Sequence, residues 1–134
     1  EAYADFSAQT GDGLVRAYLM PTGDPVHERF AYDEERIEAA CQLDDDRIML
    51  ASDTGYSPIE VAIAMNKRLH NARFPLAGER WIFTRIDLYR PFRPADAQQM
   101  TITFLQKLGV KLTRSAIAAG GQSIGHIFFS AVPK

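Results

Sequence analysis

The fold of this chain is decided by residues 53–69, which read DTGYSPIEVAIAMNKRL. This stretch predicts one long helix. Ser57 has the residue type of an N-cap, Pro58 fits the first helical position, and Glu60 can complete a capping box with the serine. Pro75 indicates that the helix ends before it, around residues 71–74.

The predicted helix has almost no polar side chains in its first half, from Ile59 to Met65. A helix that is apolar on all sides is buried, and soluble proteins bury such a helix by wrapping a sheet around it. Asn66 is the polar residue well inside the segment. A buried amide without a hydrogen bond costs about 1–3 kcal/mol. We therefore expect Asn66 either to bond a backbone group or to line a cavity where a ligand meets it.

The rest of the chain has the short, alternating apolar runs of strands, separated by glycine, proline and aspartate turns. Residues 1–10 have no clear period, and residues 14–20 fit a helix or a strand equally well. Strands are expected before the helix at residues 26–32, 36–43 and 47–51, and after it at residues 80–89, 99–108, 110–119 and 122–132. Residues 90–96 are expected to be an extended connection that prolines make rigid.

This order predicts an α+β fold in a single domain, residues 1–134: a curved antiparallel sheet wrapped around one long central helix, which is the hotdog fold. An open ferredoxin-like sheet would need a second long helix between the later strands. A cystatin-like roll is the structural alternative, with its long helices before most of the sheet.

Composition limits the classes of partner. The formal net charge of −2 gives no reason to expect binding to nucleic acid or to an anionic membrane. No stretch approaches the roughly 20 apolar residues of a membrane span. The single cysteine, Cys41, excludes an intrachain disulfide and fits a reducing compartment, so we expect a cytoplasmic protein. The three histidines are too scattered to predict a metal site, and residues 44–46 lack the pattern of a calcium loop.

Two segments resemble a known family. The DTGY of residues 53–56, followed by Ile59-Glu60 and Met65-Asn66, is similar to the central helix of FcoT-like thioesterases, hotdog proteins that act on fatty acyl thioesters. The YRPFRP of residues 89–94 resembles an arginine-proline strand end found in many hotdog enzymes. A weaker similarity lies at residues 19–21. The resemblance implies an acyl-CoA or acyl-carrier-protein substrate and no separate cofactor, coenzyme A or phosphopantetheine being part of the substrate.

The resemblance is partial at the residues that carry the chemistry. Of the family's site residues only the helical asparagine, Asn66, carries over. The family's tyrosines fall on Thr22 and near residues 49–50, and its asparagine before the helix falls near Ser57. Hotdog β-hydroxyacyl dehydratases are also similar here, with Tyr56 at the place of their histidine and Glu60 at the place of their glutamate.

Each candidate residue has a chemical and a structural interpretation. Glu60 can be a general acid or base, or only the capping box. Asn66 can polarise a thioester carbonyl, or be a satisfied core amide. Tyr56 can donate a hydrogen bond from the turn, or pack as a hydrophobic staple. Gly55 and the helix N-terminus offer N–H groups for an oxyanion.

The remaining candidates would bind the substrate. Ile63 would contact the acyl chain. Arg90 and Arg93 are preferred among the basic residues for the phosphates of coenzyme A or phosphopantetheine, because prolines hold their loop rigid.

Two hypotheses follow. The first is a homodimeric or larger enzyme that hydrolyses an acyl thioester in fatty-acid or natural-product biosynthesis, with dehydration, decarboxylation or amine addition as alternative reactions. The second is a non-catalytic module that binds an acyl group or another hydrophobic ligand. The missing tyrosines favour the second. A dimer is expected in either case, because a single hotdog sheet leaves an edge strand without a partner.

Overall fold

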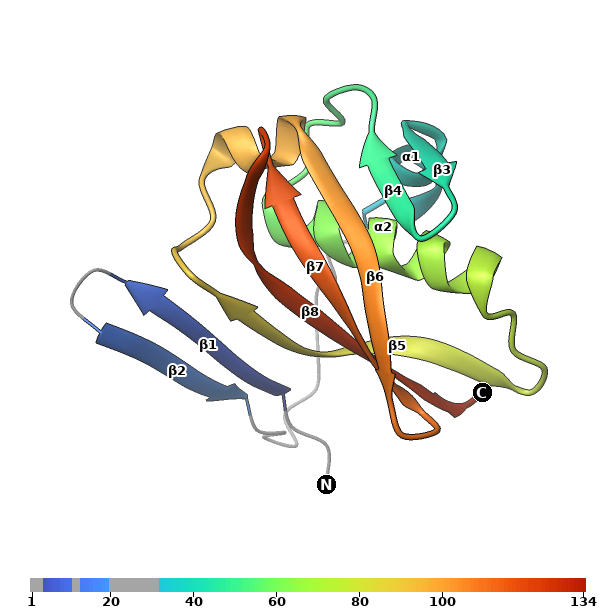
Figure 1. The fold of residues 1–134 in the computed structure, drawn as a ribbon. Helices are drawn as coiled ribbons and strands as arrows, with labels where there is room; N and C mark the ends of the chain where they lie inside the picture. The colour runs from blue at the N-terminus through green and yellow to red at the C-terminus, as the bar shows by residue number, and fades with distance from the viewer. Residues whose placement is uncertain (1–3, 11–12, 20–31) are drawn as a thin grey trace, which may run out of the picture.

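The computed structural model describes residues 32–134 in full and the backbone of residues 4–10 and 13–19 (Figure 1). Its strands and helices are, in chain order, β1 (Ala4–Thr10), β2 (Gly13–Leu19), α1 (Glu34–Ala39), β3 (Cys41–Asp44), β4 (Arg47–Leu50), α2 (Pro58–Arg73), β5 (Glu79–Leu88), the 3₁₀ helix η1 (Pro94–Gln98), β6 (Met100–Leu108), β7 (Leu112–Ala119) and β8 (Gln122–Pro133).

One sheet contains all the described strands, in the order β2-β1-β5-β8-β7-β6-β4-β3. From β5 to β3 every neighbouring pair is antiparallel, so these six strands form an antiparallel sheet. The β1–β2 hairpin extends this sheet through a parallel pairing of β1 with β5. Figure 1 shows the long strands β5 and β8 strongly curved, with the hairpin continuing beyond β5.

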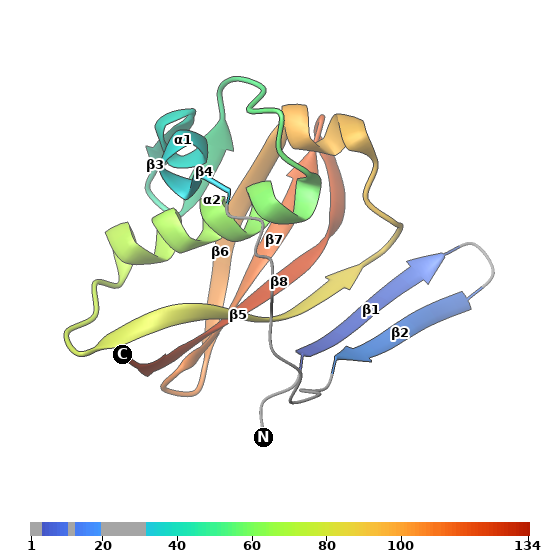
Figure 2. The same cartoon turned by 180° about the vertical axis from the view of Figure 1, so that it is seen from behind.

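Helix α2 begins as its sequence predicts. Ser57 is the N-cap and forms the complete capping box with Glu60, and Pro58 is the first helical residue. The helix ends at Arg73, before Phe74, which confirms the expected end. Its residues lie against β4, β5, β6 and η1. Figure 2, from behind, shows α2 and α1 together on one face of the sheet.

The core lies between α2 and the inner face of the sheet. Its completely buried side chains include Val61, Met65 and Leu69 from the helix and Ile102 and Phe129 from the sheet. Helix α1 adds Ile37, which is also completely buried. A helix that buries such residues is stabilised mainly by this packing rather than by its intrinsic propensity.

The hotdog fold expected from the sequence is wrong. No long central helix is present in the described chain: the two helices have six and sixteen residues and share one face of the sheet. The sheet is also not wholly antiparallel, since β1 and β5 are parallel. The expectation rested on an apolar helix buried on all sides. In fact Glu60, Lys67 and Arg68 are only half-buried, and Lys67 Nζ lies 2.9 Å from Glu34 Oε2 of α1.

The strand expected at residues 36–43 is also wrong in its first half, where α1 is found. Asp33 is the N-cap, and its side chain accepts a hydrogen bond from the Arg36 N–H at 3.3 Å. The acidic Glu34 and Glu35 occupy the first turn, where they favour a helix. The strand was predicted from alternating apolar residues. Of the residues in α1, only Ile37 is buried.

Other boundaries differ less. Residues 94–98 form a 3₁₀ helix where an extended connection was expected, whereas the four strands predicted after α2 are present with shifts of one or two residues at their ends. Residues 1–10, which had no clear period, contain β1, and the ambiguous residues 14–20 contain most of β2. The strand expected at residues 26–32 lies, except for Tyr32, outside the described residues.

Candidate functional site

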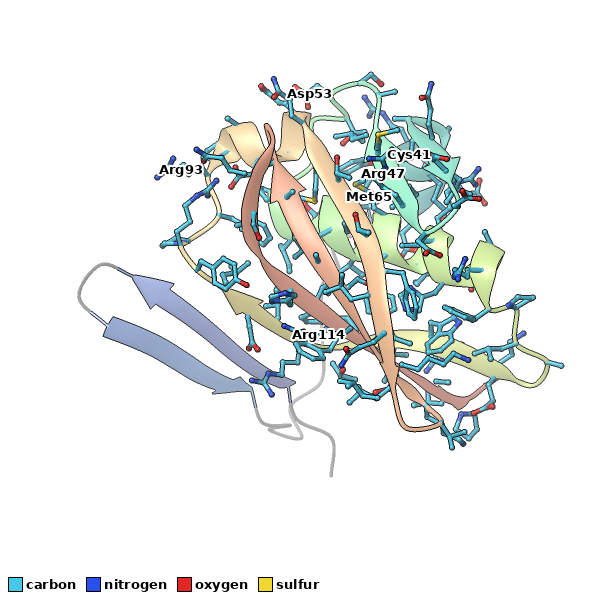
Figure 3. All side chains as sticks on the ribbon, in the orientation of Figure 1. Cys41, Arg47, Asp53, Met65, Arg93 and Arg114 are labelled. Atoms are coloured by element: carbon cyan, nitrogen blue, oxygen red, sulfur yellow. The ribbon has the colours of Figure 1, made fainter. Side chains whose placement is uncertain are left out.

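A cleft of about 520 Å³ opens beside the N-terminus of α2. We call it the α2 cleft. One wall is the loop that leads into the helix, and the other is the segment that forms η1. The residues that line it are Asp53, Gly55, Tyr56, Ser57, Pro58, Phe92, Arg93, Pro94, Ala97 and Gln98. Figure 3 shows Asp53 and Arg93 near the same end of the sheet, with Met65 farther along, toward the middle of α2.

Local hydrogen bonds shape the first wall. The Asp53 carboxylate accepts from the Gly55 N–H at 2.9 Å, and the Thr54 hydroxyl accepts from the Tyr56 N–H at 3.4 Å. Side-chain bonds of this kind, two residues along, are typical of aspartate and threonine turns. Gly55 has a φ of +79°, which residues with a side chain adopt only with strain. Gln98 from the second wall reaches Asp53 Oδ2 at 3.4 Å, so the two walls touch.

Ser57 and Glu60 form a tight polar pair at the edge of the cleft. Ser57 donates its hydroxyl to Glu60 Oε1 at 2.7 Å, and its backbone N–H donates to the same oxygen at 3.1 Å. The Glu60 N–H donates to the Ser57 hydroxyl at 3.5 Å. Ser57 is exposed and Glu60 half-buried. Glu60 itself is not among the lining residues, but it contacts Ser57, which is.

The hydrogen bonds of this loop occupy N–H groups that were predicted to bind an oxyanion. The N–H groups of Gly55, Tyr56 and Ser57 already donate to side chains of the same loop and helix. An oxyanion at this point would have to displace one of those side chains. These three N–H groups, and that of Glu60, are thus already satisfied in this structure.

Tyr56 lies between the cleft and helix α1. Its hydroxyl accepts from the Asp33 N–H at 3.1 Å, and its ring meets the Tyr32 ring edge-on with centroids 5.7 Å apart. Burial, followed by the charges of Glu34 and Glu60, raises the pKa of Tyr32 to about 12. The Tyr56 hydroxyl therefore supports the start of α1, and its ring is the part offered to the cleft.

An ion pair fixes the second wall. Arg90 donates from both terminal nitrogens to the Asp96 carboxylate, at 2.8 and 2.9 Å, and the Arg93 N–H donates to Asp96 Oδ2 at 2.7 Å. The Arg90 hydrogen bond holds the pKa of the Asp96 carboxyl below its ordinary value. Asp96 is buried and Arg90 mostly so. Arg90 therefore braces the wall, whereas the exposed Arg93 guanidinium has no carboxylate within salt-bridge distance among the described residues.

Asn66 lies in the core and does not line the α2 cleft. It is completely buried, and neither polar atom of its amide has a hydrogen-bond partner among the described residues. Its backbone carbonyl accepts from the His70 ring at 2.8 Å. The Ser115 hydroxyl on β7 is likewise buried without a partner among the described residues. Ile63 is half-buried against the core and is also absent from the lining.

The cleft thus brings together four of the residues predicted from the sequence: Gly55, Tyr56, Ser57 and Arg93. Sequence reasoning missed Asp53, Phe92 and Gln98 as lining residues. The Asp-Thr-Gly turn was a usable signal for Asp53. Nothing local pointed to Gln98, because it meets the loop only through the fold.

Within the described ranges, no group of three or more histidine, cysteine, aspartate or glutamate side chains is placed to hold a metal ion. None of the described helices has the length and apolar character needed to cross a membrane. No protein-family model matches this chain, and no curated protein or solved structure matches it. The resemblance to FcoT-like thioesterases therefore stays a hypothesis.

Proposed function

We propose that the protein binds an acyl thioester of coenzyme A or acyl carrier protein in the α2 cleft and hydrolyses it. The observation that carries this proposal is the composition of the cleft. Tyr56 and Phe92 offer aromatic surface, Arg93 offers a cation without a carboxylate partner among the described residues, and the Ser57–Glu60 pair lies at the edge. A long, partly apolar substrate with a phosphate at one end has matching chemistry.

The size and lining of the cleft support binding. Pockets for small molecules usually measure about 300–1,000 Å³ and combine apolar walls with a few polar groups. Pro58, Pro94 and Ala97 add further apolar surface to the cleft. A guanidinium binds phosphate oxygens in two-pronged fashion. Arg93 is the residue that we assign to the phosphate, because the other arginine of the segment, Arg90, is already bound to Asp96.

Glu60 is the residue that we assign to proton transfer. As a general base, its carboxylate would take a proton from water while the water oxygen attacks the thioester carbonyl carbon. The carbon–sulfur bond then breaks and the proton passes to the leaving sulfur. Glu60 Oε1 is the acceptor for Ser57, and we assign Oε2 to orient the water. Dehydration, decarboxylation or amine addition on the same class of substrate is the alternative chemistry.

The test is release of free thiol from a panel of acyl thioesters of coenzyme A and acyl carrier protein, with mass spectrometry of the products. Glu60→Gln is expected to abolish release. Glutamine at this position still accepts from the Ser57 N–H, so the capping box and the fold are kept. Glu35→Gln, on the exposed side of α1, is the matched control and should keep full activity. Intact thioesters with an altered acyl mass would point to the alternative chemistry instead.

A non-catalytic binding module is the second candidate, and one observation favours it. The N–H groups of Gly55, Tyr56 and Ser57 are occupied, so these three predicted donors are not free for an oxyanion. Under this alternative, acyl-CoA binds but is not converted to a product. Arg93→Gln weakens the binding of acyl-CoA, and Glu60→Gln leaves that binding unchanged. Calorimetry beside the thiol assay separates the two candidates.

The proposal includes a homodimer or larger homo-oligomer in the cytoplasm. Strands β2 and β3 form the two edges of the described sheet, and an edge strand can pair with a second copy. Light scattering on the purified chain measures the oligomeric state. A monomer at all concentrations would remove this part of the proposal and leave the cleft unaffected.

A further inference from the structure

Figures 1 and 2 show α1 and α2 on one face of the sheet. A second group of polar and aromatic side chains alternates with the core residues of β5, β7 and β8, and none of this group lines the α2 cleft. Three residues lie side by side across neighbouring strands: Arg85 on β5 pairs with Phe128 on β8, and Phe128 pairs with Arg114 on β7. In the next row, Asp87 pairs with His126. Figure 3 labels Arg114, well separated from Asp53 and Arg93 at the cleft.

The contacts of His126 determine its protonation. Arg114 Nη2 lies 3.1 Å from His126 Nε2, and the Tyr89 hydroxyl lies 3.3 Å from His126 Nδ1. A guanidinium can only donate, so Nε2 must be the acceptor. The ring is therefore neutral, with its proton on Nδ1 and directed at the Tyr89 oxygen. Burial and then the charge of Arg114 lower the pKa of His126, while Asp87 raises it.

The charges of this cluster do not cancel. Arg85 Nε lies 2.9 Å from Asp87 Oδ1, so these two opposite charges are paired. Arg114 lies against a neutral histidine and has no carboxylate within salt-bridge distance among the described residues. Among the described side chains of this cluster, one positive charge is left over. An anion would neutralise it.

The spacing of the two arginines suits a tetrahedral anion. Neighbouring strands lie about 4.8 Å apart, so Arg85 and Arg114 start about 10 Å apart, on either side of Phe128. The Arg85 guanidinium already leans over the Phe128 ring, with its carbon 5.2 Å from the ring centroid. Two arginine side chains can contact a phosphate group from both sides. Each would donate from the guanidinium N–H groups that do not already donate to Asp87 or His126.

We propose that Arg85 and Arg114 bind a phosphate group over Phe128, with His126 as a third donor. When the anion arrives, protonation of His126 becomes favourable, and the ring changes from an acceptor of Arg114 to a donor toward the anion. The charged groups that face His126 from the described neighbouring strands are Asp87 on β5 and Arg114 on β7. Both remain in place. Binding of phosphate should therefore be tighter at lower pH.

The experiment is a titration of the full chain with inorganic phosphate, followed by the NMR signals of the His126 ring at several pH values. The expected result is saturable movement of the His126 signals and a higher pKa for this ring in the presence of phosphate. Arg114→Gln should weaken the binding about tenfold or more, a loss of roughly 1.4 kcal/mol. Arg80→Gln, an exposed arginine on the same strand as Arg85, is the matched control and should change nothing.

Because the signal comes from His126, phosphate bound by Arg93 in the α2 cleft does not interfere. A parallel titration with glycerol phosphate shows whether the natural ligand is a phosphate ester or free phosphate. Tighter binding of the ester than of inorganic phosphate indicates a phosphate ester. Tighter binding of inorganic phosphate indicates the free ion. Arg114→Lys, which keeps the charge but not the two-pronged geometry, should bind with intermediate affinity and shows that the fold is intact. Unmoved His126 signals, or equal binding by wild type and Arg114→Gln, would overturn the proposal.

Discussion

The Nε2 atom of His70, on α2, lies 2.5 Å from the hydroxyl oxygen of Thr113, on β7, in the closed core. Nδ1 donates to the Asn66 carbonyl at 2.8 Å, so in the neutral ring Nε2 is the acceptor and the threonine is the donor. Trp81 and Phe129 surround the ring, with centroids 4.9 and 5.2 Å away. The contact joins helix and sheet, and burial of the ring favours its neutral form by lowering the pKa of His70.

Acid should therefore destabilise the protein through His70. Burial lowers the pKa of this histidine to about 4 from its ordinary value of 6.5. Between these two pH values the unfolded chain binds the proton and the folded chain does not, so the free energy of unfolding falls as the pH falls. The total loss is about 3 kcal/mol by pH 4. Urea titrations at a series of pH values measure it.

The control for this prediction is His70→Gln, which removes the titrating group. It should be less stable than wild type at pH 7, yet lose less stability between pH 6.5 and 4. The difference between the two slopes isolates the histidine from the carboxylates. Parallel slopes would mean that His70 is not held neutral in the core.

Asn66→Leu should leave the protein as stable as wild type or more stable by about 1 kcal/mol. The buried amide has no partner among the described residues, and an unsatisfied buried polar group costs about 1–3 kcal/mol. Leucine has a similar branched shape and removes that cost, while Asn66→Ala leaves a cavity and should destabilise. The backbone contact to His70 is kept in both variants. Chemical unfolding measures the difference, and a large loss with leucine would show that the amide has a partner.

The elements that sequence reasoning predicted are those with local causes. The capping box at Ser57 and the proline after it place the start of α2 correctly, since both act within one turn. The strand at Arg80–Tyr89 was predicted, but the sequence did not predict which of its side chains are buried. A register shift between Phe83 and Arg85 turns Trp81 and Ile86 to the same, buried side. Alternation alone cannot locate a bulge, because the extra residue depends on the partner strand.

The overall architecture and half of the site depend on contacts between distant segments. The prediction of a hotdog fold was wrong because the apolar pattern of α2 shows only that the helix is buried. It does not show whether a sheet alone covers the helix or whether α1 covers part of it. Gly55, Tyr56 and Ser57 were singled out from the helix start, and Arg93 from a proline-rich turn. Their meeting across one cleft could not be predicted, since it requires η1 to pack beside the α2 loop. Gln98 was missed for the same reason.

Asp96→Asn should destabilise the protein by about 3 kcal/mol, because it leaves the partly buried Arg90 guanidinium without its counter-charge. The matched control is Asp44→Asn. Its partner Arg47 and Asp44 itself are about half exposed, and such a pair contributes about 0–1 kcal/mol. Thermal unfolding compares the two variants. Since the pKa of Asp96 is lowered, its contribution is present at neutral pH and is lost only in strong acid, as the pH falls through the folded-state value.

Gly125→Ala should prevent stable folding, because β8 passes too close to β5 at this glycine. A Cβ atom here would lie well inside contact distance of the Asp87 carbonyl oxygen and 2.9 Å from the Leu88 Cα. Both neighbours are backbone atoms, so the strands would have to separate beside the pairing of Asp87 with His126. Overpacking of this kind costs about 1–3 kcal/mol when side chains can adjust, and more when backbone must move. Ser123→Ala, at an exposed position of the same strand, should be neutral in the same circular-dichroism melt, and equal melting temperatures for the two variants would contradict the close approach.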